Sequence, residues 1–352
     1  MADTRDNKKQ FMSVAEKVLT SIDRPREKEI IERRFGLNGV KETLEAVGET
    51  MGITRERVRQ IEKATLIRMR IGLDNGKNPG FDAIEIELVK VLHELGRASR
   101  VDILAEKMLG DTEQDSRGVI TFIAELSGKT LATTENERYY PAVVLTDNDD
   151  EREFKKTVDS VVEILKQHGQ PVTPDEFFKL VSGKYEHPSE VTAIASVSKQ
   201  VFTLDGKWGL AKWPTVNPRN IRDKIYIVLS QNDRKPMHFS KIAAGVKSRD
   251  FKRNNITDQA VHNELIKDDR FVLVGRGIYA LSEWGYEKGS IADVVRKILT
   301  EQSPMKRDDI IRKVLEVRQV REATILLNLQ SMPEVKRIAK SVYAWVEEPT
   351  KK

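Results

Sequence analysis

Apolar residues recur at helical spacing near the start of the chain. Ile30, Ile31 and Phe35 fall on one stripe of a predicted helix that begins at Pro25, and Gly36 is placed to end it. A second helix is predicted over 44–51. Gly52 then makes a tight turn before a third helix. A helix, a glycine-containing turn and a further helix are typical of a helix-turn-helix.

The third predicted helix has two faces of different chemistry. Threonines stand where the second and third helices begin, so Thr43 and Thr54 are predicted N-caps. At about 100° per residue, Val58 and Ile61 lie with Thr54 on one side of the helix. The opposite side carries Arg55, Glu56, Arg59, Gln60 and Lys63, and Arg57 falls at its flank.

The rest of the chain repeats a pattern at a spacing of about 65 residues. Each unit starts with helical periodicity, continues with two shorter helical segments, and ends in two β-like runs around a turn. Three helices closed by a β-hairpin make a winged helix, although small α+β domains of unrelated shapes remain the alternative. We therefore predict a mainly α fold with small β-hairpin wings: a helix-turn-helix domain followed by tandem winged-helix domains. The predicted bounds are 1–73 for the first domain, 74–82 for a linker, and 83–146, 154–214, 219–287 and 289–348 for the winged helices.

Composition narrows the chemistry that this chain can perform. It has 352 residues, a net charge of +5 and no cysteine, which excludes disulfides, thiolate metal sites and cysteine nucleophiles. Its five histidines are scattered without ligand spacing, so we expect no metal, no cofactor and no catalytic residues. No apolar run approaches a membrane span, and the polar N-terminus lacks a signal-peptide core. We expect a cytoplasmic, nucleoid-associated protein that is not an enzyme.

The polar face of the third helix matches what base reading requires. Residues 1–72 hold 16 Lys and Arg against 12 Asp and Glu, so most of the net charge lies there. Arginine can bond guanine in bidentate fashion, glutamine can pair with adenine, and glutamate can accept from cytosine. Recognition helices contact bases mostly through their first residues. A charged, solvated face is the alternative explanation, and the residue chemistry alone does not choose between the two.

Residues 26–37 (REKEIIERRFGL), 43–48 (TLEAVG) and 52–62 (GITRERVRQIE) resemble the fourth conserved region of bacterial primary sigma factors. The resemblance implies that the third helix reads the upstream (minus-thirty-five) promoter hexamer in the major groove of double-stranded DNA. It implies base or backbone contacts for Arg55, Glu56, Arg57, Arg59 and Gln60. With them, we take Lys63, Thr43 and Thr54 as candidate DNA-binding residues.

The same resemblance implies a second partner, the flap tip of the RNA polymerase β subunit. Ile30, Phe35 and Leu37 are its candidate contacts, and packing into a core explains these three residues equally well. The resemblance covers about a fifth of the chain. In sigma factors this domain comes last, whereas here it comes first, and nothing after it resembles the region that melts the promoter. We therefore expect recognition of promoter-like DNA without its opening.

A weaker resemblance lies farther along the chain. Residues 238–243 (HFSKIA) and 275–281 (GRGIYAL) are similar to the HARE-HTH winged-helix family, which implies binding to nucleic acid or to the transcription machinery. The sequence thus favours a sequence-specific transcription regulator. Two alternatives stay open: an accessory or sigma-competing factor that binds the polymerase β flap, and a non-catalytic specificity subunit of a restriction or DNA-modification system.

Overall fold

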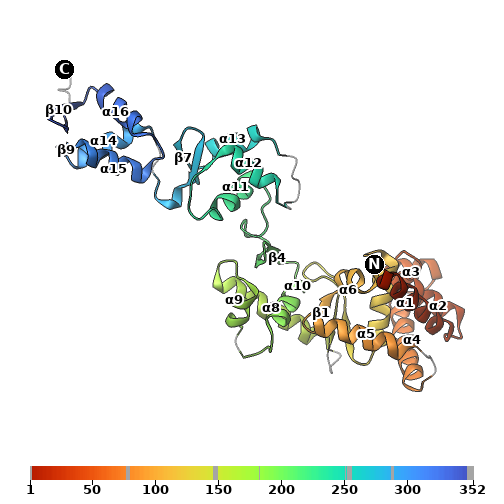
Figure 1. The fold of residues 1–352 in the computed structure, drawn as a ribbon. Helices are drawn as coiled ribbons and strands as arrows, with labels where there is room; N and C mark the ends of the chain where they lie inside the picture. Colours follow the sequence, from red (N-terminus) through yellow and green to blue (C-terminus); the bar gives the residue numbers. More distant parts are fainter. Residues whose placement is uncertain are drawn as a thin grey trace. The chain divides into compact units, whose positions relative to one another are not determined.

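The structure is a computed structural model that describes residues 2–76, 80–145, 150–181, 183–249, 251, 256–286 and 289–346. The chain forms two compact units, Met1–Asn217 and Pro218–Lys352 (Figure 1). Parts of the predicted boundaries lie outside the described residues, namely 77–79 of the linker, 146, 287 and 347–348. None of the helices in the described ranges is long and apolar enough to cross a membrane.

Three helices form what we call the head. They are α2 (Pro25–Phe35), α3 (Leu44–Met51) and α4 (Arg55–Asp74). Pro25 lies in the first turn of α2, where its missing N–H costs nothing, and Gly36 ends the helix with a left-handed φ of 68°. Ile30 packs with Val47 and Val58 in a small core that holds the three helices together. The predicted helix-turn-helix is confirmed by these elements.

The described part of the chain then contains four segments with a common order of elements, which we call repeats 1 to 4. Repeat 1 comprises α5 (Phe81–Glu94), β1 (Ala98–Arg100), α6 (Val101–Leu109), α7 (Gln114–Leu126), β2 (Thr130–Thr133) and β3 (Ala142–Leu145). Repeat 2 comprises α8 (Glu151–His168), α9 (Pro174–Leu180), α10 (Pro188–Val197), β4 (Val201–Leu204) and β5 (Lys207–Leu210).

Repeats 3 and 4 make up the second unit. Repeat 3 comprises α11 (Ile221–Ser230), β6 (Met237–His238), α12 (Phe239–Lys247), α13 (Asp258–Lys267), β7 (Phe271–Gly275), β8 (Ile278–Leu281) and the short 3-10 helix η1 (Ser282–Trp284). Repeat 4 comprises α14 (Ile291–Glu301), β9 (Met305–Lys306), α15 (Arg307–Val317), α16 (Glu322–Ser331), β10 (Val335–Ala339) and β11 (Val342–Trp345).

The small sheets of the repeats share one topology. In repeats 1, 3 and 4 the strand orders are β1-β3-β2, β6-β8-β7 and β10-β11-β9, and every pairing is antiparallel. Each time, the short strand between the first and second helices pairs with the last strand. In repeat 2, an isolated bridge between Val172 and Trp208 takes the place of that pairing. The chain is therefore mainly helical with small antiparallel sheets, as the sequence predicted.

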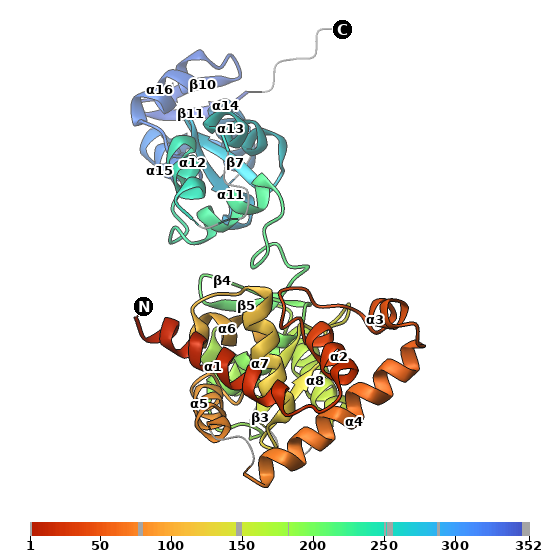
Figure 2. The same ribbon diagram turned by 90° about the vertical axis from the view of Figure 1, so that its right-hand side faces the viewer.

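An N-terminal helix that the sequence analysis did not single out joins the head to repeat 1. This helix, α1 (Ala2–Thr20), packs on α6 and α7 (Figure 2). Phe11 and Val18 of α1, Phe35 of the head and Phe122 of repeat 1 belong to one continuous core. Residues 1–73 and 83–146 thus share their hydrophobic interior, and the division into five domains stays a prediction.

Two backbones approach each other closely within this core. A Cβ built on Gly118 of α7 would lie 2.4 Å from the carbonyl oxygen of Phe35 and 3.3 Å from that of Gly36. Next to it, the rings of Phe35 and Phe122 meet edge to face at a centroid distance of 5.3 Å. The end of α2 can therefore lie on α7 only because position 118 has no side chain.

We predict that Gly118→Ala destabilises the first unit by about 1–3 kcal/mol, because the new methyl group overpacks a backbone contact that has no flexible neighbour. This loss should exceed the gain in helix propensity that alanine brings. Urea unfolding followed by circular dichroism measures the change.

Gly128→Ala is the matched control, because a Cβ at Gly128 has no atom within 4 Å. The control should unfold as the wild type does. A Gly118→Ala chain with the same urea midpoint as the control would contradict the packing described here.

Candidate nucleic-acid interface

The predicted N-caps begin both helices of the helix-turn-helix. The Thr43 hydroxyl accepts the N–H of Ala46 at 3.1 Å, and the Thr54 hydroxyl accepts the N–H of Arg57 at 3.2 Å. Between them, Gly52 ends α3 in the left-handed region with φ 65°. Both hydroxyls are used as caps, and an accepting hydroxyl can still donate its own proton to a phosphate. The Gly52 turn and the Thr54 cap together fix Arg55 as the first residue of α4.

A second glycine of the turn was missed by the sequence analysis. A Cβ on Gly48 would lie 2.7 Å from the carbonyl oxygen of Ile53. The Ile53 N–H donates to the carbonyl oxygen of Gly48 at 3.0 Å, so the chain folds back tightly over α3. Glycine inside a helix costs stability relative to alanine, and this cost was the available signal that position 48 has a packing role.

The two faces of α4 are sorted as the sequence analysis expected. Val58 and Thr65 are buried, and Ile61 is half-buried against the core of the head. The candidate DNA-binding residues of α4 are all exposed: Arg55, Glu56, Arg57, Arg59, Gln60 and Lys63. Because α4 starts at Arg55, most of these side chains stand on its first two turns.

Hydrogen bonds along this face preorganise its side chains. Arg59 donates to Glu56 through two nitrogens, at 2.6 and 2.9 Å, and Gln60 donates to the same carboxylate at 3.4 Å. The bond from Arg59 holds the pKa of the Glu56 carboxyl below its usual range. Arg55 pairs with Glu45 of α3 at 3.4 Å. Exposed pairs of this kind are worth about 0–1 kcal/mol, so they can exchange for contacts to bases.

Ion pairs behind α4 set its angle to α2. Arg34 donates to Glu62 of α4 at 3.0 Å and to the carbonyl oxygen of Glu42 at 2.6 Å. Arg33 bonds Glu42 at 2.8 Å. All of these side chains are partly shielded from water, which strengthens charged hydrogen bonds. They hold the exposed face of α4 in place against the rest of the head.

The three candidate polymerase contacts lie in cores. Ile30 is fully buried between α3 and α4, and Phe35 packs on Phe122 of repeat 1. Leu37 is partly buried against the same core as Phe35. The packing role, which the sequence allowed equally, accounts for their positions here. Contact with polymerase through them stays a prediction, and this packing does not favour it.

The repeats differ in whether their third helix is accessible. In repeat 1, α7 is mostly buried, because it packs on α1, α2 and α4. In repeat 2, α10 packs on β1 of repeat 1, where a Cβ on Gly96 would lie 2.3 Å from the carbonyl oxygen of Ser189. In repeats 3 and 4, α13 and α16 each keep one exposed face. Repeats 1 and 2 therefore serve as a support for the head, with their third helices covered.

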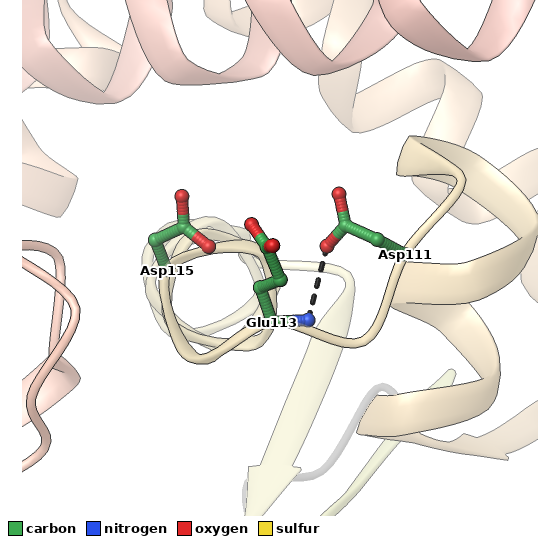
Figure 3. A group of neighbouring side chains, drawn as sticks. All are labelled: Asp111, Glu113 and Asp115. Atoms are coloured by element: carbon green, nitrogen blue, oxygen red, sulfur yellow. Dashed lines mark hydrogen bonds between the residues drawn. The ribbon is translucent and has the colours of Figure 1, made fainter.

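Three acidic side chains form a cluster outside the helix-turn-helix (Figure 3). Carboxylate oxygens of Asp111, Glu113 and Asp115 lie within 4.8 Å of one another. The Lys8 ammonium of α1 lies 2.8 Å from Asp111, 3.2 Å from Glu113 and 3.6 Å from Asp115. This cation already neutralises part of the cluster, and the four groups join α1 to the start of α7. We assign the cluster a role in packing.

Comparison with known proteins supports the helix-turn-helix of the head. The family profile of sigma-70, region 4, matches residues 24–70. A segment of 56 residues is 46% identical to the RNA polymerase sigma factor SigA of Nostoc sp. (strain PCC 7120 / SAG 25.82 / UTEX 2576) and covers 16% of this chain. A segment of 64 residues, 18% of this chain, is 45% identical to the RNA polymerase sigma factor sigB of Arabidopsis thaliana. The match indicates a DNA-binding domain of the kind that recognises promoters in transcription.

The matched family profile covers the head. The chain spans 14% of the length of the Nostoc sigma factor and 11% of the Arabidopsis one. Repeats 1 to 4 lie beyond the matched residues. The activity of a complete sigma factor is therefore not carried over to this chain.

We predict that Thr54→Ala lowers the stability of the head by about 1 kcal/mol, because the N–H of Arg57 is left without its capping acceptor. Amide hydrogen exchange in the first turn of α4 measures the local effect. Thr50→Ala is the control, because the Thr50 hydroxyl bonds to the Ala46 carbonyl inside α3. Equal exchange in both variants would show that Thr54 is not a functional cap.

We predict that Lys8→Met makes the first unit more sensitive to acid. Burial raises the pKa of Asp111, but bonds from Lys8 and from the N–H of Glu113 outweigh it and hold this pKa below its usual value. A depressed carboxyl pKa stabilises the fold above the unfolded-state pKa, and this stability is lost as the pH falls through the folded-state pKa. Removing Lys8 raises the pKa of Asp111, so unfolding should begin at a higher pH.

Thermal melts between pH 3 and pH 7 measure this shift. At pH 7 the loss in Lys8→Met should be about 1 kcal/mol, because the Lys8 side chain is partly shielded from water. Lys9→Met, at an exposed position of the same helix, is the control and should follow the wild type. Parallel acid profiles for the two variants would refute the role of the cluster.

Proposed function

We propose that this protein is a sequence-specific, DNA-binding transcription regulator that reads a promoter-like, minus-thirty-five-type element with α4. The observation that carries the proposal is the set of exposed Arg, Gln, Glu and Lys side chains on the first turns of α4, within the segment that matches sigma-70 region 4. Arg55 and Arg59 are the readers of bases. Glu56 and Gln60 complete the contact, and Thr43, Thr54, Arg57 and Lys63 bind the DNA backbone or the groove edges.

Reading of this kind requires a helix that is held in place and side chains that are accessible to the bases. The cap at Thr54 and the Arg34–Glu62 pair fix α4, whereas the side chains of Arg55 and Arg59 are 66% and 55% exposed. A bidentate base contact contributes about 1–3 kcal/mol of discrimination. This exceeds the worth of the exposed Arg59–Glu56 pair, so exchanging that pair for a base costs little.

The repeats are proposed to be winged helices, and repeat 3 a member of the HARE-HTH type. Their order of elements and the antiparallel pairing of the first short strand with the last support this. We propose that repeats 1 and 2 support the head and that repeats 3 and 4 bind flanking DNA or partner proteins. We further propose that the protein recognises promoter-like DNA without opening it and without catalysis of its own.

A polymerase-binding accessory factor is the second candidate, and the packing of Phe35 on Phe122 argues against it. Binding of the β flap through Ile30, Phe35 and Leu37 would require α2 to leave its neighbours. A pull-down of core RNA polymerase by the full chain discriminates the two. Retention of polymerase that Leu37→Asp abolishes would favour the accessory factor.

We predict that Arg55→Ala combined with Arg59→Ala removes sequence preference. Selection from a random duplex library by the wild-type chain supplies the preferred duplex. Fluorescence anisotropy should then show preference falling by roughly 1–3 kcal/mol for each bidentate base pairing that the substitutions remove. Binding to a scrambled duplex should weaken much less.

Lys9→Ala combined with Lys17→Ala is the matched control, because it removes the same charge from exposed positions of α1. This control should retain the preference for the selected duplex. An unchanged preference in the Arg55 and Arg59 double variant would refute base reading by α4.

A further inference from the structure

The second unit contains a hollow of about 750 Å³ between repeat 3 and repeat 4. It is bordered by the β7–β8 turn, by the start of α14 and by the segment that leads into α16. The residues that line it are Leu273, Val274, Gly275, Arg276, Ile278, Gly289, Ser290, Ile291, Arg318, Gln319, Val320, Arg321 and Thr324. Among these residues three are arginines and none is acidic.

Backbone contacts build the floor of the hollow. The Gln319 N–H donates to the carbonyl oxygen of Val274 at 3.0 Å, so the segment before α16 lies along β7. The buried Arg318 guanidinium donates to the carbonyl oxygens of Gly289, at 2.6 Å, and Leu273. A Cβ on Gly275 would lie 2.5 Å from the carbonyl oxygen of Gln319. The two repeats are therefore joined through main-chain bonds at this point.

The charge at the rim is positive. Arg276 in the hairpin turn and Arg321 at the N-cap of α16 are both exposed. The bordering helices α14 and α16 carry three acidic residues, Asp293, Glu301 and Glu322, and none of them lines the hollow. Asp293 bonds to Ser290 and to Arg296, while Glu322 lines a separate hollow beside α15. Among the described residues that line the hollow, the charged side chains are therefore all guanidinium groups.

The helix that starts at this rim, α16, has an exposed outer face. Arg321 caps α16 without a side-chain bond to its first N–H groups, and Arg321 and Thr324 both line the hollow. Farther along α16, Thr324, Leu327 and Gln330 are exposed, and Leu327 is 67% exposed. Guanidinium groups together with a helix N-terminus suit a phosphate.

We propose that this hollow binds a backbone phosphate of double-stranded DNA, so that the second unit makes a contact separate from that of α4. The proposal rests on the proposed function, because it presumes that DNA is the ligand of the chain. Arg276 and Arg321 hold the phosphate, while Arg318 and Gly275 keep the two repeats at the required distance. The contact adds affinity without sequence preference, because phosphates carry no base identity.

The test compares the full-length chain with Arg276→Ala combined with Arg321→Ala. Two 30-base-pair duplexes are used, the sequence selected by the wild type and a scrambled one. The double variant should bind both duplexes about tenfold more weakly and keep the preference between them. The slope of log affinity against log salt should fall by about 0.9 for each phosphate that the variant no longer binds.

Lys297→Ala combined with Arg312→Ala removes the same charge from exposed positions of repeat 4 outside the hollow, and should bind as the wild type does. Arg276→Lys combined with Arg321→Lys should keep most of the affinity and of the salt slope.

Unchanged affinity and slope in the alanine double variant overturn the phosphate contact, and α4 can still read sequence in that case. If only the Arg55 and Arg59 double variant loses the preference for the selected duplex, the proposed function stands. A wild-type chain that binds neither duplex overturns both proposals. If inorganic pyrophosphate raises the melting temperature through Arg276 and Arg321 while duplex binding is unaffected, the hollow belongs to a soluble phosphate compound and the proposal fails.

Discussion

The end of α2 lies directly on the backbone of α7 at Gly118, and much of the first unit depends on this contact. It brings Phe35 onto Phe122 and places α1 over the same core. As a consequence, the head is anchored on a broad helical support instead of standing on a flexible linker. A recognition helix gains from such anchoring, because the side chains that read bases must be held at a defined angle to the groove.

The accessibility of the third helix divides the repeats into two kinds. Where a third helix is covered, as with α7 and α10, its surface is used to build the support. Where the third helix keeps an exposed face, as with α13 and α16, it remains available to a ligand. The same order of helices and strands thus occurs in repeats whose third helix builds the support and in repeats whose third helix is accessible. The difference lies in the residues of the third helix: α7 is apolar on most sides, whereas α16 has exposed polar positions.

Two clusters of charged side chains in the first unit have different roles. On α4, Arg59 and Glu56 form an exposed pair that a base can replace at small cost. Around Lys8, three carboxylates and one ammonium join α1 to α7 in a partly shielded site. Of these two clusters, we connect only the first with DNA.

Local sequence determined the head: Pro25, Gly36, Thr43, Gly52 and Thr54 fix where its helices begin and end, because caps and left-handed turns depend on neighbouring residues alone. Helical periodicity likewise predicted the exposed face of α4 and most elements of the repeats. Only the tertiary structure decided that Phe35 meets Phe122, that α7 and α10 are covered, and that Arg276 and Arg321 share a rim. Such juxtapositions join residues far apart in the chain, and a pattern that repeats over a few residues carries no information about them.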